Sequence, residues 1–282
     1  MHNADKQLRI ALLIDADNAP AEKIDEILTE LSTLGEISVR RAYGNWTKSG
    51  LGGWQERLLE FAIRPIQQFD YSKRKNATDM AMTVDAMELL YTERPDAFGI
   101  VSSDADFTPL VMHLRSKGSA VYGFGAAQTP MPFVNACSRF LYLESLVNAT
   151  DAEAEARPET SPAAVAPAMA PIERTENVPA PGVPNRPAAL RVPSAQLRQD
   201  TRLLNLLRLA VQASEDETGW ARVGAVCTQI GNKTSFDPRN YGYATLSKLL
   251  AATQAFEFRD EGTSRVAVRD KRGTRPTPSA SV

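Results

Sequence analysis

The chain has 282 residues, of which 43% are hydrophobic and 23% charged, and its formal net charge is −2. This composition is ordinary for globular domains and excludes a mainly disordered chain, and no apolar run reaches the ~20 residues that span a bilayer. The length favours two compact domains. Residues 1–7 are polar, so we expect no signal peptide and a cytoplasmic, non-membrane protein.

Cysteine and histidine are too few and too scattered to form a zinc site. The chain holds only Cys137, Cys227, His2 and His113, none at metal-ligand spacing. Catalysis by histidine is not expected either.

Apolar runs and helical periodicities alternate along residues 8–143, as in a parallel sheet with helices on both faces. The expected order is strand 8–14, helix 21–34, strand 37–43, helix 53–62, strand 64–69, helix 79–91, strand 97–101, helix 108–117, strand 120–124 and two short elements at 132–138 and 140–143.

The second half of the chain reads differently. Residues 149–198 are dominated by Ala, Pro and Glu and predict a semi-extended linker. Helices are expected at 201–213, 221–230 and 243–252, followed by a hairpin over 256–268, which is a winged-helix order. The domains are therefore 1–148, a linker 149–198, 199–270 and a disordered tail 271–282.

Charge is unevenly divided between these parts. Residues 1–148 carry 15 Lys/Arg against 19 Asp/Glu, whereas residues 200–282 carry 12 against nine. A basic second domain is a weak indication of nucleic-acid binding and is equally consistent with ordinary surface charge.

Carboxylates follow two of the apolar strands and open one helix. Asp15 ends the first strand, Asp104 and Asp106 follow the fourth, and Asp79 begins the helix at 79–91. In an open parallel sheet, ligands bind beyond the carboxyl ends of the strands. If the two strands are neighbours, the carboxylates converge and attract Mg²⁺ or Mn²⁺, which could drive phosphodiester hydrolysis. Taken singly, each Asp could instead be a helix cap.

Cations and aromatic residues near these carboxylates suggest contacts to a polynucleotide. Lys73, Arg74 and Lys75 precede Asp79 and could hold a phosphate backbone, although a solvated loop explains them equally well. Trp46 and Trp54 are candidate base-stacking platforms, with a core role favoured for Trp54.

The carboxylates of the first domain lie in three motifs, Ile14-Asp15-Ala16-Asp17-Asn18, Lys75-Asn76-Ala77-Thr78-Asp79 and Val101-Ser102-Ser103-Asp104-Ala105-Asp106-Phe107. These motifs resemble the bacterial branch of the NYN family, which is related to PIN-domain ribonucleases. The resemblance implies a PIN-like three-layer α/β/α sandwich. It also implies a metal-dependent ribonuclease site at Asp15, Asp79, Asp104 and Asp106, with Asn18 and Ser103 as polar supports.

The second domain carries Gly219-Trp220, the hairpin and the motif Phe236-Asp237-Pro238-Arg239-Asn240-Tyr241-Gly242-Tyr243. These features resemble the OST-HTH domain, also called LOTUS. The family implies a winged helix linked to RNA binding and, in some members, to protein partners. Lys233, Arg239 and Lys248 are candidate RNA contacts.

The preferred function is therefore a metal-dependent endoribonuclease targeted by its second domain. Two alternatives stay open. One is an RNA-binding adaptor with a weak or inactive pocket. The other is a phosphatase similar to haloacid dehalogenases, which share the Asp15-x-Asp17 pattern but want a hydroxyl where this chain has Ala19.

Overall fold

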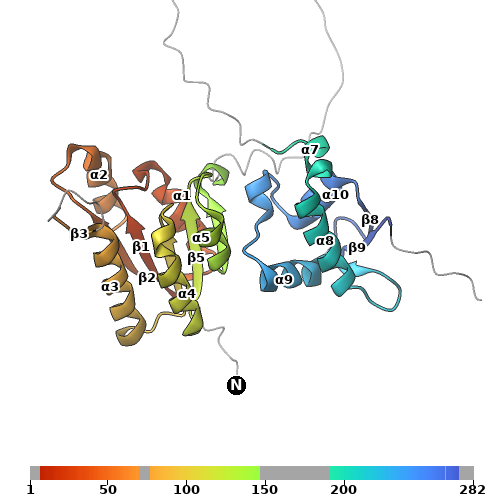
Figure 1. The fold of residues 1–282 in the computed structure, drawn as a ribbon, viewed down its shortest axis with the longest axis horizontal. Helices are drawn as coiled ribbons and strands as arrows, with labels where there is room; N and C mark the ends of the chain where they lie inside the picture. Colours follow the sequence, from red (N-terminus) through yellow and green to blue (C-terminus); the bar gives the residue numbers. More distant parts are fainter. Residues whose placement is uncertain (1–6, 70–76, 147–190, 264, 273–282) are drawn as a thin grey trace, which may run out of the picture.

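The computed structural model describes residues 7–69, 77–146, 191–263 and 265–272, which form two bodies side by side (Figure 1). The segments predicted as linker and tail fall largely outside these residues. Among the residues described, no helix is both long enough and apolar enough to cross a bilayer.

The first body is built on one six-stranded sheet in which every neighbouring pair is parallel. Its order across the sheet is β3 (Arg64–Gln67), β2 (Gly35–Gly44), β1 (Leu8–Asp15), β4 (Ala97–Val101), β5 (Ala120–Gly125) and β6 (Arg139–Tyr142). The predicted parallel sheet is confirmed.

Helices cover both faces of this sheet. α1 (Ile24–Ser32) and α2 (Gly52–Glu60) pack on one face, and α3 (Ala77–Thr92), α4 (Thr108–Ser116) and α5 (Met131–Ala136) pack on the other. Short 3-10 turns join them: η1 (Ala21–Lys23), η2 (Ser49–Leu51), η3 (Ala105–Phe107) and η4 (Leu143–Ser145). The expected three-layer α/β/α sandwich is therefore present.

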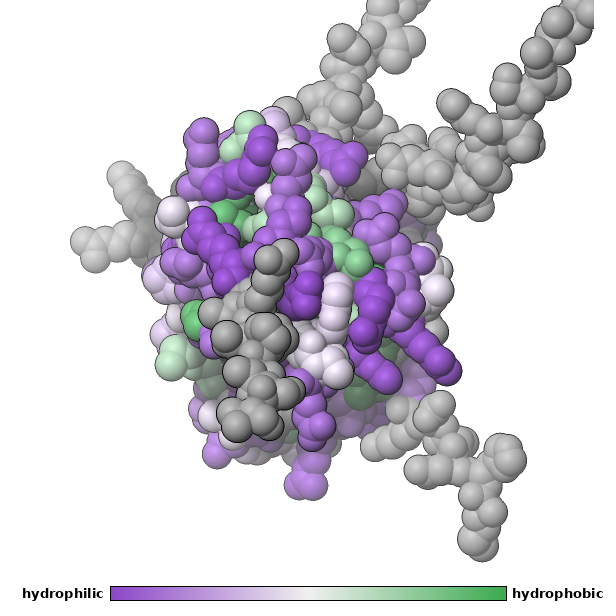
Figure 2. All heavy atoms as spheres, turned by 90° about the vertical axis from the view of Figure 1, so that its right-hand side faces the viewer, coloured by the Kyte–Doolittle hydropathy of each residue, from purple (hydrophilic) through white to green (hydrophobic). Residues whose placement is uncertain are grey.

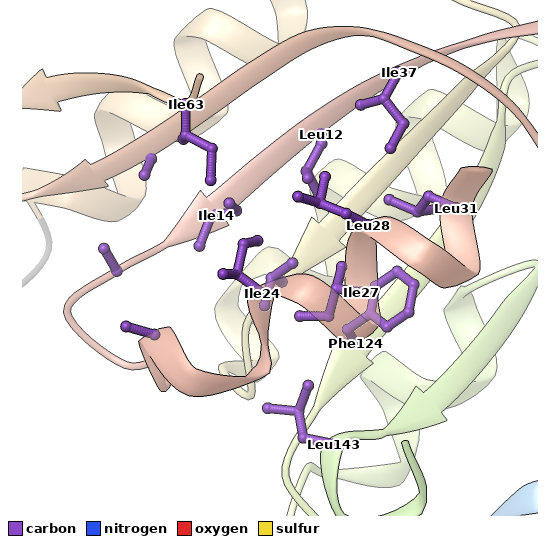
Figure 3. Close-up of a cluster of buried hydrophobic side chains, with 14 of the residues drawn as sticks. Leu12, Ile14, Ile24, Ile27, Leu28, Leu31, Ile37, Ile63, Phe124 and Leu143 are labelled. Atoms are coloured by element: carbon purple, nitrogen blue, oxygen red, sulfur yellow. The ribbon is translucent and has the colours of Figure 1, made fainter. Parts of the chain in front are cut away.

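Strand β1 is the centre of both cores. Leu12 and Ile14 point toward α1, where they meet Ile24 and Ile27 (Figure 3), while Leu13 packs on the opposite face. The alternation follows from the two-residue period of a strand, and a strand buried on both faces is apolar throughout.

The second body combines helices with a small antiparallel sheet. Its elements are α7 (Ser194–Gln199), α8 (Thr201–Ala213), β7 (Ala221–Arg222), α9 (Val223–Lys233), η5 (Pro238–Tyr241), α10 (Leu246–Thr253), β8 (Phe256–Arg259) and β9 (Ala267–Asp270). The strands lie in the order β7-β9-β8. Helices α8, α9 and α10 and the hairpin of β8 and β9 form the expected winged-helix arrangement, to which α7 and β7 are added.

Two local expectations differ from the structure. The helix expected from Ala221 begins at Val223, because Ala221 and Arg222 pair with β9. Helix α7 lies within the stretch expected to be linker and buries Leu197 in the second core. We therefore propose that the second domain begins near residue 191 rather than 199.

Gly123 in β5 lies where no side chain fits. A Cβ there would come within 2.5 Å of Cδ2 of Phe140 and 2.6 Å of Sγ of Cys137. We predict that Gly123→Ala lowers the free energy of unfolding by about 1–3 kcal/mol through overpacking. Urea denaturation measures this. Gly50→Ala is the control, because nothing lies within 4 Å of a Cβ at Gly50. Equal stability of the two variants would contradict the packing described.

Candidate functional site

The predicted carboxylates gather at the carboxyl ends of β1 and β4, which are neighbours in the sheet. Strand order reverses at this pair, and the crevice outside such a reversal is where open α/β sheets bind ligands. Asp15 is the last residue of β1, Asp104 follows β4, Asp106 lies in η3, and Asp79 lies in the first turn of α3.

Asp15 is fully buried, and only one of its two carboxylate oxygens accepts hydrogen bonds. Its Oδ2 accepts hydrogen bonds from Nδ2 of Asn18 at 2.9 Å and from Oγ of Ser102 at 3.0 Å. Its Oδ1 is buried without a hydrogen-bond partner. Burial raises the pKa of Asp15, as do the charges of Asp17 and Asp104, and the hydrogen bonds from Asn18 and Ser102 oppose this. A buried carboxylate oxygen without a partner is unfavourable, and a bound proton or cation would stabilise it.

The pKa of Asp79 depends on all the other carboxylates near it. Burial, followed by the charges of Asp15, Asp104, Asp106 and Asp17, raises its pKa to about 6. The other three carboxylates proposed from the sequence, together with Asp17, therefore lie within electrostatic reach of Asp79.

Asp104 holds the turn that follows β4. Its Oδ1 accepts a hydrogen bond from the backbone N of Asp106 at 2.8 Å and so caps η3. Its own backbone N donates to Oγ of Ser102 at 3.1 Å, and Ser102 in turn donates to Asp15. Asp104 thus has a capping role and also lies in the cluster, while Asp106 is exposed at its rim.

Asp17 and Thr78 form a contact that the sequence analysis did not anticipate. Oγ1 of Thr78 donates to Oδ2 of Asp17 at 2.8 Å, and Nζ of Lys48 lies 3.7 Å from Oδ1. The contact ties the loop after β1 to the start of α3 and so positions Asp79. The only sequence signal was that both residues lie inside the quoted motifs.

The two proposed polar supports take different places. Asn18 contacts Asp15, whereas Oγ of Ser103 accepts a hydrogen bond from the backbone N of Ala126 at 2.8 Å and fixes the loop after β5. The neighbouring Ser102 supports Asp15 instead. Lys73, Arg74 and Lys75 lie outside the described residues.

Three further residues of the first domain have structural partners. Asp85, one of the acidic residues of α3, binds Arg41 and the hydroxyl of Tyr43. Trp54 is buried, as favoured, and donates to the carbonyl of Ala19. Trp46 is partly buried and donates to the carbonyl of Ile66.

The chemistry of the cluster fits a hard divalent cation, because every donor is a carboxylate, amide or hydroxyl oxygen and one buried oxygen lacks a partner. Over the described ranges, however, no three acidic, histidine or cysteine side chains stand close enough together to hold one ion.

The raised pKa of Asp79 has a consequence for stability. Because the value of about 6 exceeds the ordinary 3.8, ionised Asp79 destabilises the fold above about pH 6, and the penalty is absent below about pH 4. Asp79 is partly exposed, so after solvent screening we expect Asp79→Asn to stabilise the fold by about 1 kcal/mol, or ~2–4 °C in Tm, at about pH 8.

Calorimetry without divalent ions tests this, with Asp25→Asn at an exposed position of α1 as control. A shift for Asp79→Asn that is the same at about pH 4 and about pH 8 would contradict the assigned repulsion.

Comparison with known proteins is in line with this architecture. One curated relative, the uncharacterized protein MJ0482 of Methanocaldococcus jannaschii, is 34% identical over 122 residues, which cover 42% of this chain and 48% of that protein. The chain thus spans about half the length of this relative.

Two solved structures show weaker likeness. A protein of unknown function from Vibrio parahaemolyticus has 18% identity and a TM-score of 0.41, covering 50% of this chain and 96% of its own. An uncharacterized protein from Nitrosomonas europaea has 22% identity and a TM-score of 0.24, covering 36% and 98%. Scores this low establish nothing about function.

The family comparison is more informative. Residues 9–144, which contain all five carboxylates, match the NYN domain. Residues 197–268 match the OST-HTH/LOTUS domain. The chain therefore carries an NYN domain followed by an OST-HTH/LOTUS domain.

Proposed function

We propose that the protein is a metal-dependent endoribonuclease whose second domain holds RNA. The observation that carries the proposal is the buried, unpartnered Oδ1 of Asp15 at the meeting point of five carboxylates. The NYN domain supports a ribonuclease in general, and the OST-HTH/LOTUS domain supports RNA as the ligand. The cytoplasmic location stays a prediction.

Asp15, Asp79, Asp104 and Asp106 would hold Mg²⁺ or Mn²⁺. Such an ion, when bound, activates water and stabilises displacement at phosphorus. The chain's own residues prepare the site. Asn18 and Ser102 hold the Asp15 carboxylate through Oδ2 and leave Oδ1 free to face a cation. With a pKa of about 6, the Asp79 carboxyl can take up or release a proton close to neutral pH.

Substitution at Asp104 tests this function. Asp104→Asn removes one charge from the cluster while its amide oxygen can still cap η3. We predict that RNA cleavage in Mn²⁺ falls by about a hundredfold or more, because a metal ligand is lost. Purified protein is incubated with single-stranded and structured RNAs, with Mn²⁺ or EDTA. Asp25→Asn, on the surface of the same domain, is the matched control and should cleave normally. Cleavage that persists in EDTA or in Asp104→Asn would contradict metal-dependent cleavage at this site.

A second candidate is an RNA-binding adaptor. It is favoured by the absence, within the described part of the chain, of three carboxylates placed to share an ion. The same assay separates the two, since an adaptor would bind RNA tightly and leave every RNA intact at all metal concentrations.

The phosphatase alternative receives no support. Ala19, where such enzymes want a hydroxyl, is partly buried and packs against the first core. The motifs around it belong to the stretch that matches the NYN domain.

Basic residues of the second domain test the RNA-holding role. Lys233 and Lys248 are exposed, at the end of α9 and in α10. We predict that Lys233→Glu with Lys248→Glu weakens RNA binding about tenfold at low salt and flattens its salt dependence. Fluorescence anisotropy in the Asp104→Asn background measures this without cleavage. Lys117→Glu, on the first domain, is the control. Unchanged affinity would move the RNA contact to another face of the domain.

A further inference from the structure

Among the described residues, the second domain contacts the first through the segment Asp237-Pro238-Arg239-Asn240, which includes the start of η5. We propose that this segment is a docking element that holds the second domain on the β6 edge of the first domain's sheet, within one chain. The proposal goes beyond the proposed function and does not depend on it.

Asn240 closes the edge of the sheet. Strand β6 is the last strand in the sheet order, so the backbone groups on its outer side have no neighbouring strand. Nδ2 of Asn240 donates to the carbonyl of Phe140 at 2.9 Å, and Oδ1 accepts from the backbone N of Tyr142 at 3.1 Å. One side-chain amide thus makes the pair of hydrogen bonds that an added strand would make, and edges left open invite unwanted pairing.

Four charges beside Asn240 alternate in sign across the contact. Arg239 forms a bidentate pair with Glu30 of α1, with Nη1 at 2.6 Å and Nη2 at 2.8 Å from the carboxylate oxygens. Nη2 of Arg139, in β6, lies 2.6 Å from Oδ2 of Asp237. Arg239 also binds Asp237, and Arg139 lies 3.5 Å from Glu30, so the four side chains close into one network.

This network is not an ordinary surface ion pair. The side chain of Asp237 is 1% exposed and that of Glu30 is 12% exposed. Burial alone would raise the pKa of Asp237, but the hydrogen bonds and charges of Arg239 and Arg139 outweigh it and hold that pKa below its ordinary value. A bidentate pair between largely buried groups specifies one geometry, because its hydrogen bonds form only when the side chains meet in that arrangement.

The occupant of this edge is the same chain's own second domain. Residues 147–190 separate the described ends of the two domains. That length reaches ~150 Å when extended, so the chain can span the contact without strain. Attachment within one chain raises the local concentration of the second domain, which favours docking within one chain over docking between copies.

Docking also decides which surfaces remain for RNA. The guanidinium of Arg239 is engaged by Glu30 and Asp237, so Arg239 is not an RNA contact in this arrangement. The hairpin of β8 and β9 lies on the side away from the first domain (Figure 1). Figure 2 shows this outer face of the second domain. Hydrophilic side chains make up most of the part that is not hidden by grey atoms.

Spin-label distances in the full chain test the proposal. Cys227 is exposed in α9 and Cys137 is buried, so one label goes on Cys227 and another on the thiol introduced by Ser116→Cys at the end of α4. We expect one narrow distance distribution. It should become broad in Asn240→Asp with Arg239→Gln, since the new carboxylate cannot donate to Phe140. The matched control is Asn232→Asp with Arg265→Gln, which makes the same changes at exposed positions.

Each outcome decides the matter. A broad distribution in the unaltered chain, or a narrow one in the docking variant, would overturn the proposal. Loss of the narrow peak after mixing with excess unlabelled protein would assign the contact to a second copy and overturn docking within one chain. Circular dichroism checks that the variant folds. If it does not, Arg139→Gln on the opposite side of the contact gives the same test.

Discussion

Mutual repulsion among five carboxylates, held at one end of a parallel sheet, is the constraint on which the candidate site depends. Asp15 cannot move away, because it ends a strand that is buried on both faces and paired on both sides. Asp104 is fixed by its capping bond, and Asp79 by the anchoring of α3 through Thr78. The fold thus holds carboxylates close together, and their repulsion is reduced when one of them is protonated or a cation binds.

The same sheet serves the two domains in different ways. Its centre, where the strand order reverses, collects the carboxylates, and its edge at β6 receives the second domain. Both features follow from the geometry of the backbone. The ends of neighbouring strands lie close together at the centre of the sheet, and the edge strand has backbone N–H and C=O groups without a neighbouring strand. Docking at this edge fixes the orientation of the second domain relative to the acidic cluster.

Apolar runs and helical periodicities in the sequence predicted most of the fold, but the contacts between residues far apart in the chain were not predicted. Asp15 and Asp104 could be placed because each follows an apolar strand, and the end of a strand is legible in sequence. Thr78 and Asp17 are 61 positions apart, and Arg139 and Asp237 are 98 apart, so their contacts depend on tertiary packing. Helix α7 was missed because Ala- and Pro-rich composition precedes it and a six-residue helix shows almost no periodicity.

The central claim is that the carboxylate cluster is a divalent-cation site, and calorimetric titration with Mn²⁺ tests it most directly. Near pH 6, where Asp79 is partly protonated, binding should release protons, seen as a dependence of the measured heat on the buffer's ionisation enthalpy. That dependence should vanish at about pH 8, and Asp15→Asn should abolish binding. Absence of Mn²⁺ binding at millimolar concentration, or binding that is unchanged in Asp15→Asn, would contradict the account.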